Sequence, residues 1–231
     1  MVNVDDCAVV QPQWRHYRVI HSKLPPKNLF DVDDADAMLL GEVESMTNER
    51  MVNWRQYVAA DDGRFGQGWG AVMAPFCYPR HGRFTTDDKG AYYCSDSAQT
   101  AIAQWSYHTA RFWRQFGHDK EVSAVVRCYT GHFKEAIIDI RGCTELCQKD
   151  PSHEYRIHGE FAATARRQNA FGILYRSARR EGGECAALLR PPATSALTQS
   201  AHYVLMFDGQ AFREYAQLGD LKVIEDNSGQ L

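Results

Sequence analysis

Apolar side chains recur along this chain with two periodicities. One alternates, which is typical of strands, and the other has intervals of three and four residues, which are typical of amphipathic helices. Alternation over residues 13–22 predicts a strand, which Pro25-Pro26 would end because proline has no backbone donor. The helical period runs over residues 33–57, where aspartates at the start favour a helix N-terminus. It returns over residues 97–116 and 153–167.

Shorter apolar runs predict further strands. They cover residues 69–76, 121–129, 133–141, 172–177, 185–190 and 201–207, and one more strand ends at Ser95. Gly131-His132 is the expected turn between the runs at 121–129 and 133–141, and Asp208-Gly209 leads to a short helix over residues 211–217. Strands interleaved with helices of uneven length predict an α+β fold, without the regular repeat of a doubly wound sheet.

The chain is long enough for one domain with additions. Its 231 residues, 44% of them hydrophobic, can bury a sizeable core. The expected organisation is an N-terminal tail over 1–12, a single mixed domain over 13–209, and a C-terminal helix and tail over 210–231. Within the domain we expect a helical insertion at about 33–57 and a glycine-rich loop at about 59–82. This loop lacks the glycine spacing of known nucleotide loops.

Charge and cysteine content narrow the class of protein. A net charge of −3 argues against direct nucleic-acid binding, and no apolar run is long enough for a membrane span. The acidic N-terminus has no signal-peptide core, so we expect a cytoplasmic protein. Seven cysteines, mostly in apolar runs, indicate free thiols in a reducing compartment. Cys143 and Cys147 form the only close pair, and no second pair completes a zinc site, so no metal is expected.

Residues 82–105 have the pattern of an anion-binding pocket. Arg83 precedes a short apolar strand that carries Tyr93, and Ser95-Asp96-Ser97 then supplies the N-cap of a helix. A helix N-terminus favours anions, so this unit could hold a phosphate-bearing ligand against an aromatic face. The same pattern also fits a surface arginine, a core tyrosine and an ordinary capped helix, and this segment alone leaves both interpretations open.

Several segments together resemble the RES domain family, the toxin component of Xre-RES toxin–antitoxin systems, named after an Arg, a Glu and a Ser. The resembling segments are Tyr17-Arg18-Val19-Ile20, Pro25-Pro26-Lys27-Asn28-Leu29-Phe30, Gly82-Arg83-Phe84, Gly90-Ala91-Tyr92-Tyr93, Thr100-Ala101-Ile102-Ala103 with Tyr107-His108, Gly172-Ile173-Leu174-Tyr175-Arg176-Ser177-Ala178-Arg179 and Gly182-Gly183-Glu184-Cys185. The resemblance implies an ADP-ribosyltransferase-like fold. It also implies an NAD-consuming activity, as an NAD glycohydrolase or as an NAD phosphorylase with inorganic phosphate as co-substrate, and a helix-turn-helix antitoxin of Xre type as partner.

Carried over position by position, the resemblance implies the site. Arg18 and Arg83 match the family's site arginines, Tyr93 its pocket tyrosine and Ser177 its serine, while the family's glutamate falls on Gln104. Arg18, Arg83, Gln104 and Ser177 are therefore the catalytic candidates, and Arg18, Arg83, Tyr93 and Ser177 the NAD-binding ones. Gln104 can hydrogen-bond a ribose hydroxyl, but it offers no negative charge to an oxocarbenium-like transition state.

The missing carboxylate leaves three functions open: an NAD-cleaving toxin, a weakened or silent relative that binds NAD, ADP-ribose or a partner protein, and a transferase that places ADP-ribose on a macromolecule. The glutamate that often opens the same family segment falls on Gln99, so both acidic positions are amides. Glu181 and Glu184 are the acids nearest in sequence to the family serine, and either could replace the carboxylate. His108 and Cys185 are expected to be packing residues.

Overall fold

The computed structural model describes residues 2–22, 54–86, 88–147 and 155–219. Its elements in chain order are η1 (Val4–Asp6), β1 (Ala8–Val10), β2 (Arg15–His21), α2 (Trp54–Tyr57), η2 (Ala60–Asp62), α3 (Gly70–Cys77), β3 (Tyr92–Ser95), α4 (Ala98–Gln115), β4 (Glu121–His132), β5 (Ile137–Asp139), α5 (Thr144–Cys147), α6 (Arg156–Arg167), β6 (Gly172–Arg176), β7 (Glu184–Leu188), η3 (Pro191–Ala193), β8 (Thr198–Asp208) and β9 (Phe212–Leu218). Within the described residues the strands form one nine-stranded sheet, ordered β1-β5-β6-β7-β3-β2-β4-β8-β9, in which β5 and β6 run parallel and the other neighbours antiparallel. The predicted single domain of mixed strands and helices is confirmed.

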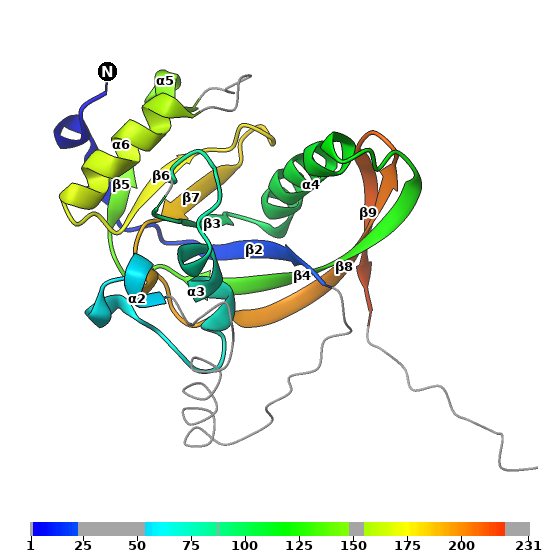
Figure 1. The fold of residues 1–231 in the computed structure, drawn as a ribbon, viewed down its shortest axis with the longest axis horizontal. Helices are drawn as coiled ribbons and strands as arrows, with labels where there is room; N and C mark the ends of the chain where they lie inside the picture. Colours follow the sequence, from blue (N-terminus) through cyan, green and yellow to red (C-terminus); the bar gives the residue numbers. More distant parts are fainter. Residues whose placement is uncertain (1, 23–53, 87, 148–154, 220–231) are drawn as a thin grey trace, which may run out of the picture.

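The sheet divides into two halves at a fork between β2 and β3 (Figure 1). These two strands share the single register pair Tyr17–Ser95, whereas β2 pairs with β4 along its whole length. One half contains β1, β5, β6, β7 and β3, and the other contains β2, β4, β8 and β9. Because β3 leaves β2 so soon, its backbone polar groups at the fork are open to side chains.

Helices cover both faces of the sheet. On one face α2 and α3 pack against Tyr92, and on the other α5 and α6 pack in the cluster that contains Tyr175, with Tyr93 at its side. Ser95 shares the face of Tyr93 because side chains alternate along a strand, and its pairing partner Tyr17 packs among the residues under α4. Helices α4 and α6 therefore lie on the same face of the sheet.

Three predicted elements close to the site are confirmed. Strand β2 lies within the predicted span 13–22, and α4 and α6 lie within 97–116 and 153–167. Ser97 caps α4 as expected, since its Oγ accepts the backbone N–H of Thr100 at 3.2 Å. All seven cysteines are free thiols, as predicted.

The predicted strand at 69–76 is wrong. This stretch forms helix α3, so the glycine-rich loop expected at 59–82 contains both η2 and a two-turn helix. A short apolar run bounded by glycines fits a strand or a buried helix equally well, and periodicity alone does not separate them. Packing decides the outcome, because Val72, Met73 and Phe76 are all buried against the sheet.

The predicted hairpin of 121–129 and 133–141 is also wrong. Strand β4 runs on through Gly131 to His132 and pairs with β2 and β8, whereas β5 pairs with β1 and β6. Gly131 serves close packing instead of a turn, because a Cβ there would lie 2.6 Å from the His16 ring. The buried His16 Nε2 and Thr194 Oγ1 are hydrogen-bonded at 2.7 Å, and burial lowers the pKa of His16 to about 3, which keeps it neutral.

Both ends of the domain differ from the prediction. Residues 211–217 were expected to be helical, but from Phe212 onward they lie in β9, which pairs antiparallel with β8. The turn between them explains the error: Gly209 has φ +89°, and Asp208 Oδ1 accepts the N–H groups of Gln210 and Ala211 at 2.8 and 2.7 Å. The predicted tail over 1–12 contains η1 and β1, which pairs with β5. Most of the predicted insertion at 33–57 lies outside the described residues.

Gly90→Ala is expected to destabilise the fold by about 3 kcal/mol. A Cβ at Gly90 would overlap the Pro75 carbonyl oxygen and approach Phe76 Cα, so α3 would be pushed away from β3. The free energy of unfolding from denaturant titration measures this loss. Gly142→Ala is the matched control, expected to change stability by less than about 0.5 kcal/mol, because a Cβ there meets no atom within 4 Å. Equal losses in both variants would contradict the close-packing argument.

Candidate active site

Gln104 and Ser177 meet at the centre of the candidate site. Gln104 lies on α4 and Ser177 directly follows β6. Gln104 Nε2 donates to Ser177 Oγ at 2.9 Å, and Ser177 Oγ also accepts the backbone N–H groups of Arg179 and Arg180 at 3.2 and 3.0 Å. Ser177 Oγ is therefore rich in donors, and Gln104 Oε1 is left as the acceptor atom of this pair.

The Cys185 thiol lies behind this pair. Gln104 Nε2 also donates to Cys185 Sγ at 3.5 Å, and Ser95 Oγ lies 3.5 Å from the same sulfur. Burial raises the pKa of Cys185 to about 11, so the thiol stays protonated near neutral pH. Cys185 is a buried packing residue, as predicted, and it helps to fix the amide of Gln104.

Arg83 and Tyr93 lie on the same face of the sheet. The Arg83 side chain is buried, with its guanidinium carbon 5.6 Å from the Tyr175 ring centroid and 5.9 Å from that of Tyr155. Tyr93 Oη accepts the backbone N–H of Phe84 at 3.0 Å, and burial raises the pKa of Tyr93 to about 12. Because Phe84 follows Arg83, this neutral phenol fixes the loop that carries the arginine.

Arg18 occupies the fork between β2 and β3. Its Nη1 donates to the Tyr93 carbonyl oxygen at 2.8 Å, and its guanidinium carbon lies 4.7 Å from the Tyr92 ring centroid. Tyr17 and Val19, its neighbours on β2, pack under α4, so Arg18 points to the opposite face. Burial lowers the pKa of Arg18, and no carboxylate pairs with it in the described part of the chain. The structure therefore brings Arg83, Tyr93, Gln104 and Ser177 to one face, and links Arg18 to them through the backbone of Tyr93.

The family model of the RES domain matches residues 54–208, which include Arg83, Tyr93, Gln104 and Ser177. This chain belongs to the RES domain family. The family is NAD-consuming, and the match begins after β2, so Arg18 lies outside it. No curated protein matches the chain. Among solved structures, it is similar to the crystal structure of the M. tuberculosis MbcT-MbcA toxin-antitoxin complex, with 13% identity, 93% of this chain and 89% of that chain covered, and a TM-score of 0.39.

In this RES domain Glu184 does not point toward Gln104. Glu184 Oε1 forms an ion pair with Arg141 at 2.7 Å, and Glu184 alternates with Cys185 along β7, so it points away from Gln104. Glu181 lies exposed on the loop between β6 and β7. The hypothesis that Glu184 replaces the family acid is therefore wrong. Gln99 lies exposed in the first turn of α4, away from the Gln104–Ser177 contact.

The RES domain also presents groups that sequence reasoning missed. The Arg179 guanidinium carbon lies only 3.4 Å from the Tyr107 ring centroid, and Tyr107 is one helical turn beyond Gln104. Tyr155, at the start of α6, adopts φ +51°, which is uncommon for a residue with a side chain. Tyr107 and Arg179 were inside the family-like segments, but nothing in the sequence indicated the Tyr155 conformation. His108 is exposed on α4 with its ring 5.3 Å from that of Tyr107.

Over the described ranges 2–22, 54–86, 88–147 and 155–219, no group of three or more His, Cys, Asp or Glu side chains could hold a metal ion. In those same ranges no helix combines the length and the apolar character that crossing a bilayer requires.

Proposed function

We propose that this RES domain protein cleaves the nicotinamide–ribose bond of NAD and so depletes NAD, with water or inorganic phosphate as the acceptor. The observation that carries the proposal is the contact between Gln104 and Ser177 on the face of the sheet that also holds Arg83 and Tyr93. These four positions come from a loop, a strand, a helix and a strand end, and the resemblance to the family assigns each of them to its site. The activity class follows from the family, and the reaction subtype is the proposal.

Each side chain has a role that its surroundings allow. Gln104 Oε1 would accept a hydrogen bond from a ribose hydroxyl, because its Nε2 is already engaged with Ser177 and Cys185. Ser177 would orient a ribose or phosphate oxygen, and the buried Arg83 would bind the pyrophosphate or the attacking phosphate with a charge-assisted bond. Tyr93 supplies an aromatic wall for nicotinamide. Arg18 would act as a positioning residue, since it holds the Tyr93 backbone.

Charge explains why the reaction should be slow. The transition state for cleavage of a glycosidic bond carries positive charge on the ribose, and a family glutamate would stabilise it. Here the amide of Gln104 occupies that position, and the nearest acid along β7, Glu184, is held by Arg141 on the other face. This arrangement also favours a second candidate function: a silent relative that binds NAD, ADP-ribose or a partner protein without turnover. Transfer of ADP-ribose to a macromolecule is the third.

An antitoxin is the partner that this function needs. An enzyme that depletes NAD would harm the cell that makes it, so a protein that blocks the site would have to accompany it. We propose a helix-turn-helix antitoxin of Xre type in this role, on the basis of family membership. The MbcT-MbcA complex is itself a toxin–antitoxin pair.

The purified protein is expected to release nicotinamide from NAD slowly. With radiolabelled NAD, chromatography should show ADP-ribose without added phosphate and a phosphorylated ADP-ribose when phosphate is the acceptor. Label on protein or nucleic acid would support the transferase. Binding of NAD without nicotinamide release would support the silent relative, and the absence of both binding and release would contradict the proposed site.

A further inference from the structure

Beyond the reaction centre, α4 continues with a face of aromatic and basic residues. Tyr107 and Arg111 are four residues apart, so they lie on the same side of the helix, one turn from each other. Arg179 reaches this face from the loop between β6 and β7 and stacks on the Tyr107 ring at 3.4 Å. The same loop delivers Ser177 to Gln104, so the Arg179–Tyr107 stack borders the reaction centre directly.

Tyr155 faces this stack from the start of α6. The Arg83 guanidinium carbon lies 5.9 Å from the Tyr155 ring centroid. Burial raises the pKa of Tyr155, and the positive charges of Arg83, Arg179 and Arg111 oppose that rise. The Tyr155 backbone has φ +51° and ψ +28°, in the left-handed region that costs a non-glycine residue about 1 kcal/mol or more. Backbone strain of this kind clusters at ligand sites, where the surrounding structure holds it.

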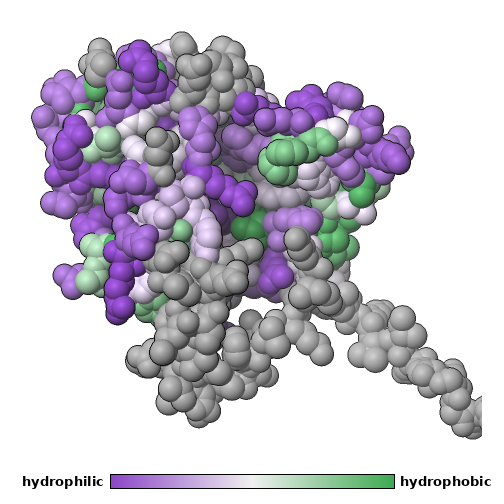
Figure 2. Space-filling view, viewed as in Figure 1, coloured by the Kyte–Doolittle hydropathy of each residue, from purple (hydrophilic) through white to green (hydrophobic). Residues whose placement is uncertain are grey.

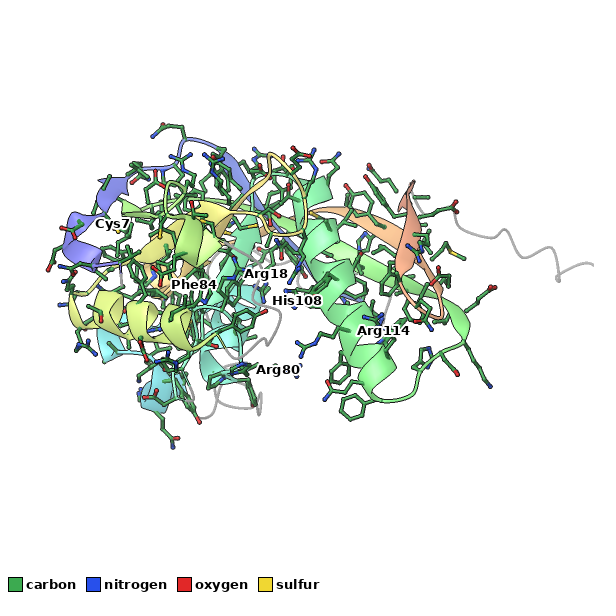
Figure 3. The ribbon with its side chains drawn as sticks, turned by 90° about the horizontal axis from the view of Figure 1, so that it is seen from above. Cys7, Arg18, Arg80, Phe84, His108 and Arg114 are labelled. Atoms are coloured by element: carbon green, nitrogen blue, oxygen red, sulfur yellow. The ribbon has the colours of Figure 1, made fainter. Side chains whose placement is uncertain are left out.

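The shape and charge of this region suit an anion. Figure 2 shows the surface hollowed beside α4, and Figure 3 shows Arg80 and His108 reaching toward the same space from opposite sides. In the described part of the chain no carboxylate forms an ion pair with Arg111 or Arg179. Unpaired guanidinium groups beside tyrosine rings can bind phosphate oxygens and offer a stacking surface to a base.

The distance of Arg111 from Gln104 along α4 indicates which part of a ligand would contact Arg111. A helix rises about 1.5 Å per residue, so Arg111 lies about 10 Å beyond Gln104 along the axis. If Gln104 contacts the ribose whose bond is cleaved, Arg111 is too far from the reacting carbon to act on it. It is placed to meet the other nucleotide of an extended dinucleotide.

We propose that the adenylate half of NAD binds between α4 and the start of α6, with its phosphate on Arg111 and Arg179 and with Tyr107 and Tyr155 as the walls of this adenylate subsite. The inference rests on the proposed function for the identity of the dinucleotide. Its chemistry, a nucleoside diphosphate held by two arginines, is testable without any cleavage of NAD.

ADP is the probe, because it carries the adenosine and two phosphates but no nicotinamide. Calorimetric titration should show that Arg111→Gln and Arg179→Gln each weaken ADP binding by about 10- to 100-fold, the usual range for a charge-assisted hydrogen bond. Arg167→Gln is the matched control. This substitution removes the same charge at an exposed position of α6, about 16 Å along the axis from the start of that helix. The Arg167→Gln variant should therefore bind ADP as tightly as the unmodified chain. Thermal unfolding verifies that each variant is folded.

Turnover of NAD provides an independent readout. In the adenylate subsite, Arg111→Gln and Arg179→Gln should raise KM for NAD more than they lower kcat, because the lost contacts are made in the ground state as well. If the unmodified chain does not bind ADP, or if both variants bind it as tightly as Arg167→Gln, the adenylate subsite is wrong even when NAD is cleaved. If ADP binding depends on both arginines but no nicotinamide is ever released, the adenylate subsite is supported and the proposed cleavage of NAD is contradicted.

Discussion

Gln104→Glu is expected to raise the rate of nicotinamide release from NAD by about 100- to 1000-fold, the usual effect of one well-placed electrostatic group. Glutamate has nearly the same shape as glutamine, so α4 and the contact with Ser177 should persist. The hydrogen bond would reverse, with Ser177 Oγ donating to the new carboxylate while it still accepts the N–H groups of Arg179 and Arg180. The second carboxylate oxygen would face the ribose in place of Gln104 Oε1 and stabilise its developing positive charge.

Gln99→Glu is the matched control for this change. It introduces the same charge on the same helix, but at an exposed position about one and a half turns before Gln104, where little change in rate is expected. The measurement is kcat from nicotinamide release at saturating NAD. Equal rates in the unmodified chain and in Gln104→Glu would mean that residue 104 does not face the reacting carbon. A rise of the same size in Gln99→Glu would trace the effect to net charge and not to the site.

The strands that could be predicted from the sequence are the buried ones. Alternation marked β2, and continuous apolar runs marked β6 and β7, because these strands have at least one face against a core. Strand β9 could not be found in this way, since almost every residue from Phe212 to Leu218 is exposed and no inside–outside pattern exists. It is a strand because β8 offers hydrogen bonds along its edge, which is a tertiary effect. Gly131 was misread for a related reason, since its neighbour His16 is distant in sequence.

The order and spacing of the family-like segments predicted which residues form the site, but not how each side chain is oriented. The resemblance placed Arg83, Tyr93, Gln104 and Ser177, and the structure brings them to one face of the sheet. The same resemblance grouped Arg18 with them, but the alternation of β2 turns its side chain to the fork and the Tyr92 ring. Local sequence also gives no sign of the left-handed Tyr155 backbone or of the approach of Arg83 to its ring, since the two residues are far apart in the chain.

Arg83→Gln is expected to lower kcat/KM for NAD by at least about 100-fold, with little change in the unfolding temperature. The Arg83 guanidinium is buried among Tyr93, Tyr155 and Tyr175, where the low dielectric strengthens its attraction for a phosphate. Glutamine can still donate a hydrogen bond, but it removes the charge. The kcat/KM of Arg83→Lys should lie between that of the unmodified chain and that of Arg83→Gln. Lysine keeps the positive charge but lacks the planar guanidinium that binds two phosphate oxygens at once.

Arg18→Gln makes the same substitution from the opposite side of β3 and should give the opposite pattern. The glutamine amide is a donor too, but its shorter side chain withdraws that donor from the Tyr93 carbonyl oxygen in the fork, which leaves a part-buried acceptor unsatisfied at a cost of about 1–3 kcal/mol. We therefore expect a clear fall in unfolding temperature and a smaller loss of kcat/KM than in Arg83→Gln. Nicotinamide release and thermal unfolding, measured on both variants, separate the roles. If Arg18→Gln removes activity without any loss of stability, Arg18 contacts the substrate directly, and the ligand must extend through the fork to the other face of the sheet.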